Sequence, residues 1–166
     1  MFVALGETCR PMGMTLERWG WLTTLAYRRS FEEVPELLRK RPKFLLKFPK
    51  AVNFGLHMKD RTNEKLARLW NGGFETETQM PTEEFPVIYY IKACPLQKFA
   101  EEQGYSEYMP YLCNLDYVTF HFFGIPFYRE KTCAAGDGVC DFKVKRNGTV
   151  NEAWPCHCLT EGDSLK

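Results

Sequence analysis

The chain has 166 residues and a formal net charge of +1, and 45% of its residues are hydrophobic and 15% aromatic. A chain of this length fits one domain and buries roughly two thirds of its unfolded surface without help from a metal or disulfide. The balanced charge disfavours a nucleic-acid-binding protein, and no apolar run reaches the ~18 residues that a membrane span needs. The seven cysteines cannot all pair internally. Since the first residues lack a secretion signal, we interpret the cysteines as thiols of a cytoplasmic protein.

Residues 1–73 show the apolar spacing of helices. Between Thr15 and Arg28, apolar side chains recur every three or four residues, which predicts an amphipathic helix with Thr15 as its N-cap. Three later helices are predicted from their start signals, which are a capping box from Ser30 to Glu33, the segment Phe44–Leu46 after Pro42, and Thr62 before a helix that buries Leu66 and Leu69.

From residue 74 the apolar period changes to two, which is typical of strands. Strands are predicted over residues 74–80, 85–93, 127–133, 139–145 and 149–154, and helices over 95–103 and 107–123. Asn147-Gly148 is a strong signal for a tight hairpin turn before the last of these strands.

These elements predict an α+β fold. We expect an antiparallel sheet of about four to five strands, helices packed on one side of it, and a mostly helical N-terminal part. We expect one domain over residues 1–155, divided into a helical part (1–73) and a sheet-and-site part (74–155), with a tail over 156–166.

A thiol and a carboxylate share one face of the predicted helix 107–123. Cys113 and Asp116 are three residues apart, so their side chains can meet. If this face points inward, Asp116 needs a partner, because an unpaired buried charge is very costly. The alternative is that Asp116 faces solvent and Cys113 is a small core residue.

Other candidate side chains lie on or beside the predicted strands. Cys140 shares a strand face with Phe142, and Cys94 lies where a strand gives way to a helix. Each is also compatible with a plain core thiol. Arg129 can bind both oxygens of a carboxylate ligand, or it can form an ion pair across the sheet.

No cofactor and no metal are predicted. The spacing of the cysteines between Cys94 and Cys140 matches no close-paired zinc pattern. Cys156-His157-Cys158 is compact enough to bind a metal, but it falls in the predicted tail. His121 lies about 80° round the helix from Cys113, so a catalytic Cys–His pair would be poorly aligned.

Several motifs occur in the order and approximate spacing of a known family. They are Cys94-Pro95, Cys113-Asn114-Leu115-Asp116, Arg129 to Thr132 followed by the small-residue loop Ala134–Gly138, and Cys140-Asp141-Phe142. Over about residues 90–145 the chain resembles the L-2-amino-thiazoline-4-carboxylic acid hydrolase family. It departs from that pattern at Glu130, where threonine is usual, and at Cys133, where leucine is usual, and either departure can indicate a different substrate.

The resemblance implies hydrolysis of a cyclic C=N bond, with ring opening toward a carbamoyl-cysteine. It implies that Asp116 holds the amidine or acts as general base, and that Cys113 or Cys140 attacks as a thiolate. Arg129 would hold the substrate carboxylate, with Cys94 and Thr132 also at the substrate. The expected partner is a small-molecule substrate rather than nucleic acid or a membrane, and a homo-oligomer is compatible with the sequence.

Two other classes of protein remain open. The aromatic excess also suits a non-enzymatic small-molecule-binding domain, similar in outline to 4-vinyl-reductase-type modules, that encloses a hydrophobic ligand. In such a domain the pocket would be apolar, with Cys113 and Asp116 turned away from it. A partner-binding subunit would instead need an exposed aromatic patch.

Overall fold

A computed structural model describes residues 2–69 and 73–148, and within them the chain forms six α-helices and four strands. The helices are α1 (Phe2–Cys9), α2 (Leu16–Arg29), α3 (Glu36–Leu45), α4 (Pro49–Leu69), α5 (Pro95–Gln103) and α6 (Met109–Phe122). The strands are β1 (Glu75–Thr78), β2 (Val87–Ala93), β3 (Phe127–Tyr128) and β4 (Cys140–Val144). The α+β class with a helical N-terminal region is therefore confirmed.

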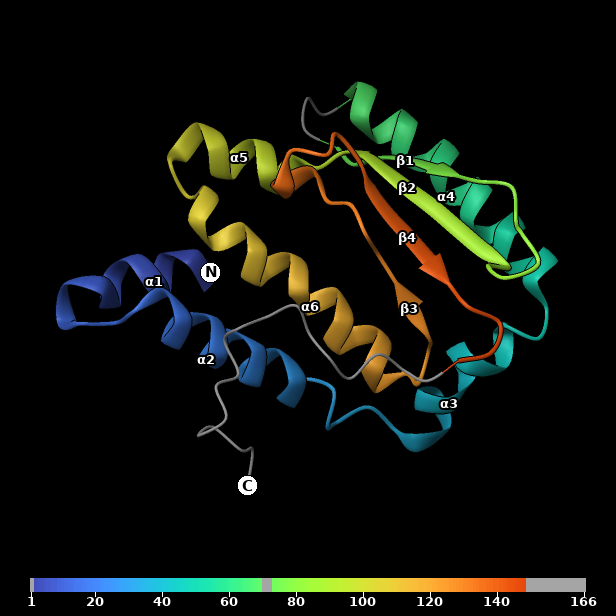
Figure 1. Ribbon diagram of the computed structural model, residues 1–166, viewed down its shortest axis with the longest axis horizontal. Coiled ribbons are helices and arrows are strands. Elements are labelled where there is room, and N and C mark those ends of the chain that lie inside the picture. The colour runs from blue at the N-terminus through green and yellow to red at the C-terminus, as the bar shows by residue number, and fades with distance from the viewer. Residues whose placement is uncertain (1, 70–72, 149–166) are drawn as a thin grey trace.

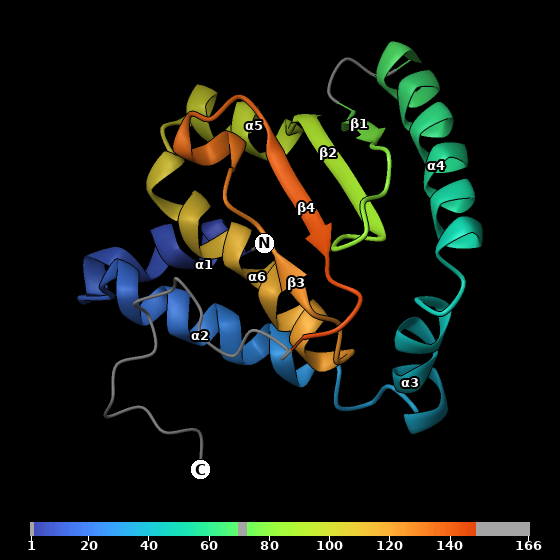
Figure 2. The ribbon, with the colours of Figure 1, turned by 45° about the vertical axis from the view of Figure 1, so that its right-hand side comes forward.

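The four strands form one antiparallel sheet in the order β1-β2-β4-β3. The β2–β4 register places six side chains on one face: Val87, Tyr89, Ile91, Cys140, Phe142 and Val144. Val52 and Leu56 of α4 pack against this inner face, and so do Tyr117 and Phe120 of α6. Helix α4 lies toward the β1 edge and α6 toward the β3 edge (Figure 1 and Figure 2).

Aromatic rings fill the space between α6 and the sheet. Phe120 stacks on Phe127 with ring centroids 4.2 Å apart, and Tyr117 meets Phe127 edge-on at 4.9 Å. Phe127 in turn lies 5.3 Å from Phe142. Such pairs add about 0.5–1.5 kcal/mol each beyond the burial of their surface, so much of the aromatic content forms a packed core rather than an empty cavity.

Helix α2 packs on α6 on the side away from the sheet (Figure 1). Trp19 is buried there, and its Nε1 donates a hydrogen bond to the carbonyl of Phe2 at 2.9 Å. A Cβ on Gly20 would lie 2.1 Å from the ring of Tyr111, so only glycine permits this close approach of the two helices.

Helix α4 is fastened to the sheet edge through one carboxylate. Asp60 accepts hydrogen bonds from the hydroxyl of Thr76 at 2.7 Å, and from the backbone N–H and hydroxyl of Thr78 at 2.7 and 2.6 Å. Burial alone would raise the pKa of Asp60, but these bonds lower it below its usual value. This contact sets α4 against β1 and so forms one wall of a cavity.

The helix starts predicted at Ser30 and at Phe44 are wrong. Ser30 ends α2, and its hydroxyl donates to the carbonyl of Tyr27 at 2.6 Å instead of capping a new helix. Helix α3 begins after Pro35 and continues past the predicted break to Leu45. Phe44 therefore closes a helix where the sequence predicted that one would open.

The start predicted at Thr62 is also wrong, because α4 is a single helix of 21 residues. The Thr62 hydroxyl donates to the carbonyl of Met58 at 3.0 Å, inside the helix. Leu66 and Leu69, which were predicted to be buried, are 47% and 76% exposed. Despite the length of α4, no helix in the described residues is both long and apolar enough to cross a membrane.

Four of the five predicted strands are present but shorter, and the predicted strand 127–133 is reduced to the two residues of β3. Cys133–Ala135 form a turn of 3₁₀ helix instead, because the Thr132 hydroxyl accepts a hydrogen bond from the backbone N–H of Ala135. The strand predicted at 149–154 and the tail lie outside the described residues.

Candidate active site

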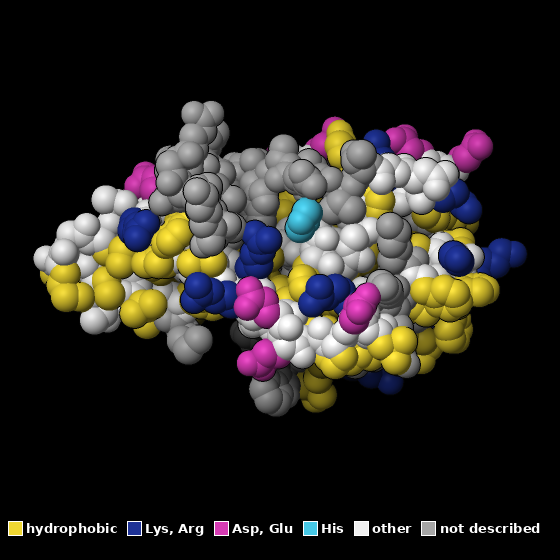
Figure 3. Space-filling view, turned by 90° about the horizontal axis from the view of Figure 1, so that it is seen from below, with side chains coloured by type: hydrophobic (Ala, Val, Ile, Leu, Met, Phe, Trp, Pro, Cys, Tyr) yellow, Lys and Arg dark blue, Asp and Glu magenta, His cyan; other side chains and the backbone are white. Residues whose placement is uncertain are grey.

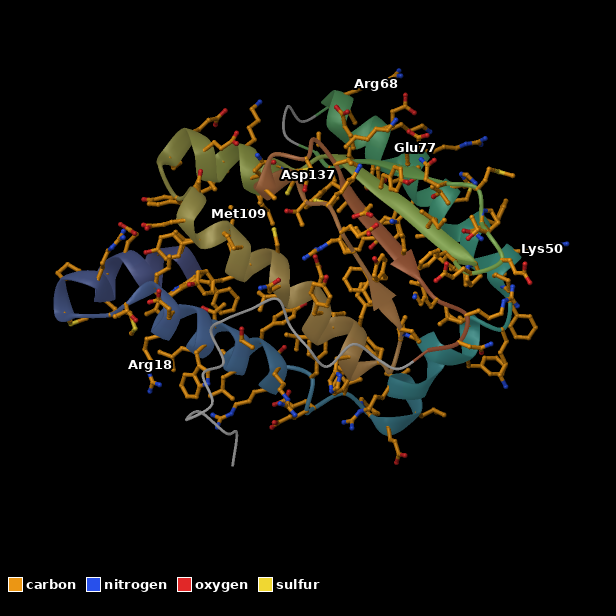
Figure 4. The ribbon with its side chains drawn as sticks, viewed as in Figure 1. Arg18, Lys50, Arg68, Glu77, Met109 and Asp137 are labelled. Atoms are coloured by element: carbon orange, nitrogen blue, oxygen red, sulfur yellow. The ribbon has the colours of Figure 1, made fainter. Side chains whose placement is uncertain are left out.

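A cavity of about 280 Å³ lies between α4, α6 and the inner face of the sheet. This volume is at the small end of ligand pockets. The polar and sulfur-bearing side chains that line it are Lys59, Asn63, Thr76, Tyr89, Cys94, Met109, Cys113, Asp116, Arg129 and Cys140. Met109, labelled in Figure 4, stands at the first turn of α6. Five of the six predicted site residues thus share this one cavity.

Asp116 and Arg129 form the charged centre of the lining. Arg129 Nη1 donates to Asp116 Oδ2 at 2.7 Å, and Nη2 donates to the carbonyl of Cys113 at 2.9 Å. The Arg129 side chain is only 4% exposed, whereas that of Asp116 is 41% exposed. The buried arginine therefore holds the partly exposed carboxylate of Asp116 in place at the cavity wall.

Three aromatic rings surround the Arg129 guanidinium. Its Cζ lies 5.1 Å from the ring centroid of Tyr117, 5.7 Å from that of Phe127 and 5.5 Å from that of Phe142. Contacts of this kind stabilise a buried cation. The ion pair predicted as an alternative for Arg129 exists, but it joins the residue to helix α6 rather than across the sheet.

Asp116 has an altered proton affinity. Burial among protein atoms raises the pKa of Asp116 above its usual value, although the charge of Arg129 and its hydrogen bond act in the opposite direction. Its Oδ1 accepts no hydrogen bond from any residue in the described part of the chain. This oxygen is therefore available to a ligand or to a water molecule.

Two of the cavity thiols, those of Cys113 and Cys140, are held in their neutral form. Burial raises the pKa of Cys113 to about 12, against the opposing charge of Arg129. Burial likewise raises the pKa of Cys140 to about 12, although the backbone N–H of Cys133 donates to its Sγ at 3.1 Å. Neither thiol is a ready thiolate in the ligand-free protein.

Three residues considered in the sequence do not join this group. Thr132 lies outside the lining and caps the 3₁₀ helix. His121 is exposed, and Asp141 points to the opposite face of the sheet from Cys140, as predicted. Cys156-His157-Cys158 lies outside the described residues, within which no group of three or more His, Cys, Asp or Glu could hold a metal ion.

Comparison with protein families gives one match, to the L-2-amino-thiazoline-4-carboxylic acid hydrolase family, over residues 14–144. The chain belongs to this family. The match covers the helical N-terminal part as well as the residues 90–145 that carried the resemblance. Comparison with curated proteins gave no match, and comparison with solved structures gave none.

The two departures from the family's motifs lie outside the cavity. Glu130 binds Lys143 at 3.0 Å and the Tyr128 hydroxyl at 2.8 Å. Cys133 is buried, with its Sγ 3.5 Å from the carbonyl of Ile91. Neither side chain lines the cavity, so neither changes the groups that a ligand in it would meet.

The sequence did not mark most of the lining residues as site residues, among them Tyr89, Lys59 and Asn63. Tyr89 stacks on Phe142 with centroids 4.7 Å apart, and burial followed by the charge of Asp116 raises the pKa of its phenol. The alternation of side chains along a strand predicts that Tyr89 and Ile91 share one face. It cannot predict that Tyr89 pairs with Phe142 of β4, because the register between the two strands is set by the fold. Lys59 lies before the helix that was predicted to begin at Thr62, and no motif in the sequence marked Asn63 as a site residue.

Two other hollows lie near the sheet edge. A larger one, of about 740 Å³, runs between α4 and β1, where Figure 4 labels Arg68 and Glu77. Four of its charged side chains are paired with each other: Arg68 with Glu64, and Glu77 with Lys92. The other, of about 420 Å³, lies between α5 and the loop that contains Asp137. Neither contains the Asp116–Arg129 pair.

Proposed function

We propose that this protein is a hydrolase of the L-2-amino-thiazoline-4-carboxylate type, which adds water to a cyclic C=N bond and opens the ring. One observation carries the proposal: Asp116 is held by a buried arginine in a small cavity that it shares with three thiols. Family membership independently supports the same reaction class. No nucleic acid or membrane partner is part of this proposal.

Asp116 is the proposed general base. Its Oδ2 is held by Arg129, so Oδ1 can accept a proton from a water molecule. The raised pKa makes this carboxylate a stronger base than an ordinary aspartate. The water oxygen then bonds to the C=N carbon, and the electron pair of the C=N bond goes to the ring nitrogen. This nitrogen takes the second water proton as the new hydroxyl becomes the carbamoyl C=O. The C–S bond breaks, and the departing sulfur receives the proton held by Asp116, leaving carbamoyl-cysteine.

Water is a better nucleophile candidate here than Cys113 or Cys140. With a pKa of about 12, each thiol contributes a thiolate fraction on the order of 10⁻⁵–10⁻⁴ near pH 7.5. Arg129 is proposed as a positioning residue for Asp116. Its guanidinium lies near three aromatic rings and its side chain is only 4% exposed, which disfavours a direct role in binding the substrate carboxylate.

The binding-module alternative fits the cavity less well. It predicted an apolar pocket with Cys113 and Asp116 turned away, whereas both line the cavity. Tyr117, Phe120 and Phe127, which belong to the aromatic excess that such a domain would use to enclose a ligand, pack on one another. These contacts support an enzyme rather than a carrier of a hydrophobic molecule.

The test is incubation of the purified protein with 2-amino-thiazoline-4-carboxylate in ¹⁸O-labelled water, followed by mass spectrometry. We expect carbamoyl-cysteine carrying one ¹⁸O atom, because the water oxygen becomes the carbamoyl oxygen. Saturable binding without product would favour the binding module. If the compound is neither bound nor converted, both functions are ruled out for this compound.

A further inference from the structure

The substrate's carboxylate needs a cationic side chain that is not already held in an ion pair. Arg129 is committed to Asp116 and to the carbonyl of Cys113, and its side chain is 4% exposed. The charges of Arg129 and Asp116 also cancel each other. An incoming carboxylate would have to compete with a 2.7 Å ion pair, and it would meet the Asp116 charge beside it.

Lys59 is the other cation in the cavity lining. Its side chain is exposed, and it forms no ion pair with any residue that the structure describes. The adjacent acid on α4, Asp60, is occupied by Thr76 and Thr78. Lys59 is one helical turn before Asn63, which also lines the cavity, so both side chains lie on the face of α4 that borders it.

The lining therefore has one uncompensated positive charge. Two cations, Lys59 and Arg129, face one carboxylate, Asp116. The excess is on the α4 wall, while the carboxylate is on the α6 wall (Figure 2). A ligand with a cationic amidine at one end and a carboxylate at the other would match both walls at once.

We propose that Lys59 binds the carboxylate of the substrate, and thereby orients the amidine toward Asp116 and selects acidic thiazolines over uncharged ones. This inference rests on the proposed hydrolase function. It moves the carboxylate-binding role from Arg129, to which the family resemblance assigned it, to a residue of α4. Because Lys59 lies at the solvent side of the cavity, its contribution is modest and weakens with salt.

The test compares two ligands across three variants. The ligands are 2-amino-thiazoline-4-carboxylate, measured by KM and kcat, and 2-amino-2-thiazoline, which lacks the carboxylate, measured as a competitive inhibitor. Lys59→Met should raise KM for the acid about tenfold with kcat changed less than about threefold, and should leave the inhibition constant unchanged. Lys59→Arg should keep most of the wild-type KM.

Lys65→Met is the matched control, since it removes the same charge from an exposed position of α4 that does not line the cavity. An unchanged KM in Lys59→Met would overturn the inference while leaving the hydrolase function intact. An equal rise in Lys65→Met, or an equal loss of affinity for both ligands, would overturn it too. If the wild-type protein neither binds nor converts the acid, the proposed function and the inference both fail.

Discussion

At the scale of single residues, the environment of the cavity thiols decides how the reaction starts. The family resemblance implied that Cys113 or Cys140 attacks as a thiolate. In the fold, burial outweighs the charge of Arg129 and raises the pKa of both thiols. A cysteine near an arginine therefore stays a neutral thiol where burial outweighs the effect of the arginine's charge.

Replacing these thiols by alanine tests this point. If water is the nucleophile, Cys113→Ala and Cys140→Ala should each keep kcat/KM within about tenfold of wild type, because no bond to sulfur is needed. Alkylation of both thiols by iodoacetamide near pH 7.5 should be slow in the wild-type protein. A loss of three or more orders of magnitude in one correctly folded variant would instead identify that cysteine as the nucleophile.

The Cys113–Asp116 pair could be predicted from the sequence, because three-residue spacing places both side chains on one helix face. The ion-pair partner of Asp116 could not be predicted. Arg129 reaches Asp116 only because β3 and α6 pack together through Phe127 and Tyr117. A contact between two elements through their tertiary packing cannot be read from the spacing of either element.

At the scale of elements, β4 places interacting side chains on both faces of the sheet. Its inner face contributes Cys140 to the cavity. On the outer face, Asp141 Oδ1 accepts the backbone N–H groups of Glu130 and Lys131 at 3.0 and 2.6 Å, and Lys143 pairs with Oδ2 at 2.8 Å. Asp141 thus holds the segment that directly follows Arg129.

Two substitutions of Asp141 should differ in stability. Asp141→Ala leaves two backbone N–H groups without their acceptor, so it should lower the free energy of unfolding by about 2–4 kcal/mol. Asp141→Asn keeps one oxygen for these donors and should cost less. Urea unfolding at pH 7 measures both. Equal stability of the alanine variant and the wild-type protein would contradict the anchoring role.

The same carboxylate gives a pH dependence of stability. Although burial opposes it, the bonds from Lys143 and the two backbone N–H groups lower the pKa of Asp141 below its usual value. A lowered folded-state pKa stabilises the protein above the unfolded-state value of about 3.9, and this contribution is lost as pH falls through the folded-state value. The difference between wild type and Asp141→Asn should therefore shrink in acid.

Elements with complete local signals could be predicted from the sequence. Helix α5 has the predicted bounds, since Pro95 starts it and Gly104, at φ 75°, ends it. Helix α4 does not have the predicted bounds, because a threonine such as Thr62 can either cap a helix or donate to the preceding turn. The contact of α4 with β1 through Asp60 favours the second arrangement. This error removed Lys59 from the predicted site.

At the scale of the whole molecule, exposed apolar side chains suggest a contact surface. On α3 and α4 and in the turn between them, Phe44, Phe48 and Phe54 are 54%, 53% and 70% exposed. Figure 3 shows hydrophobic side chains at the surface on the side where α3 lies. Patches of this kind occur at protein–protein contacts, and they are compatible with the predicted homo-oligomer.

The candidate site itself exists only in the assembled molecule. Its walls come from α4, β1, β2, the start of α5, α6, the segment after β3, and β4, which include elements far apart in the sequence (Figure 1). The sequence indicated which residues of the C-terminal half belong together, and the fold adds the wall that α4 provides. We propose that hydrolysis in this cavity depends on Asp116.

The most direct test is kcat/KM of Asp116→Asn on 2-amino-thiazoline-4-carboxylate, with thermal melting to verify folding. A working general base contributes about 10²–10⁴-fold, so we expect a loss in that range. Asp137→Asn, an aspartate outside the cavity that accepts the Thr132 N–H, should stay close to wild type. Wild-type activity should fall on the acid side through the raised pKa of Asp116. A rate for Asp116→Asn within a few-fold of wild type would contradict the account.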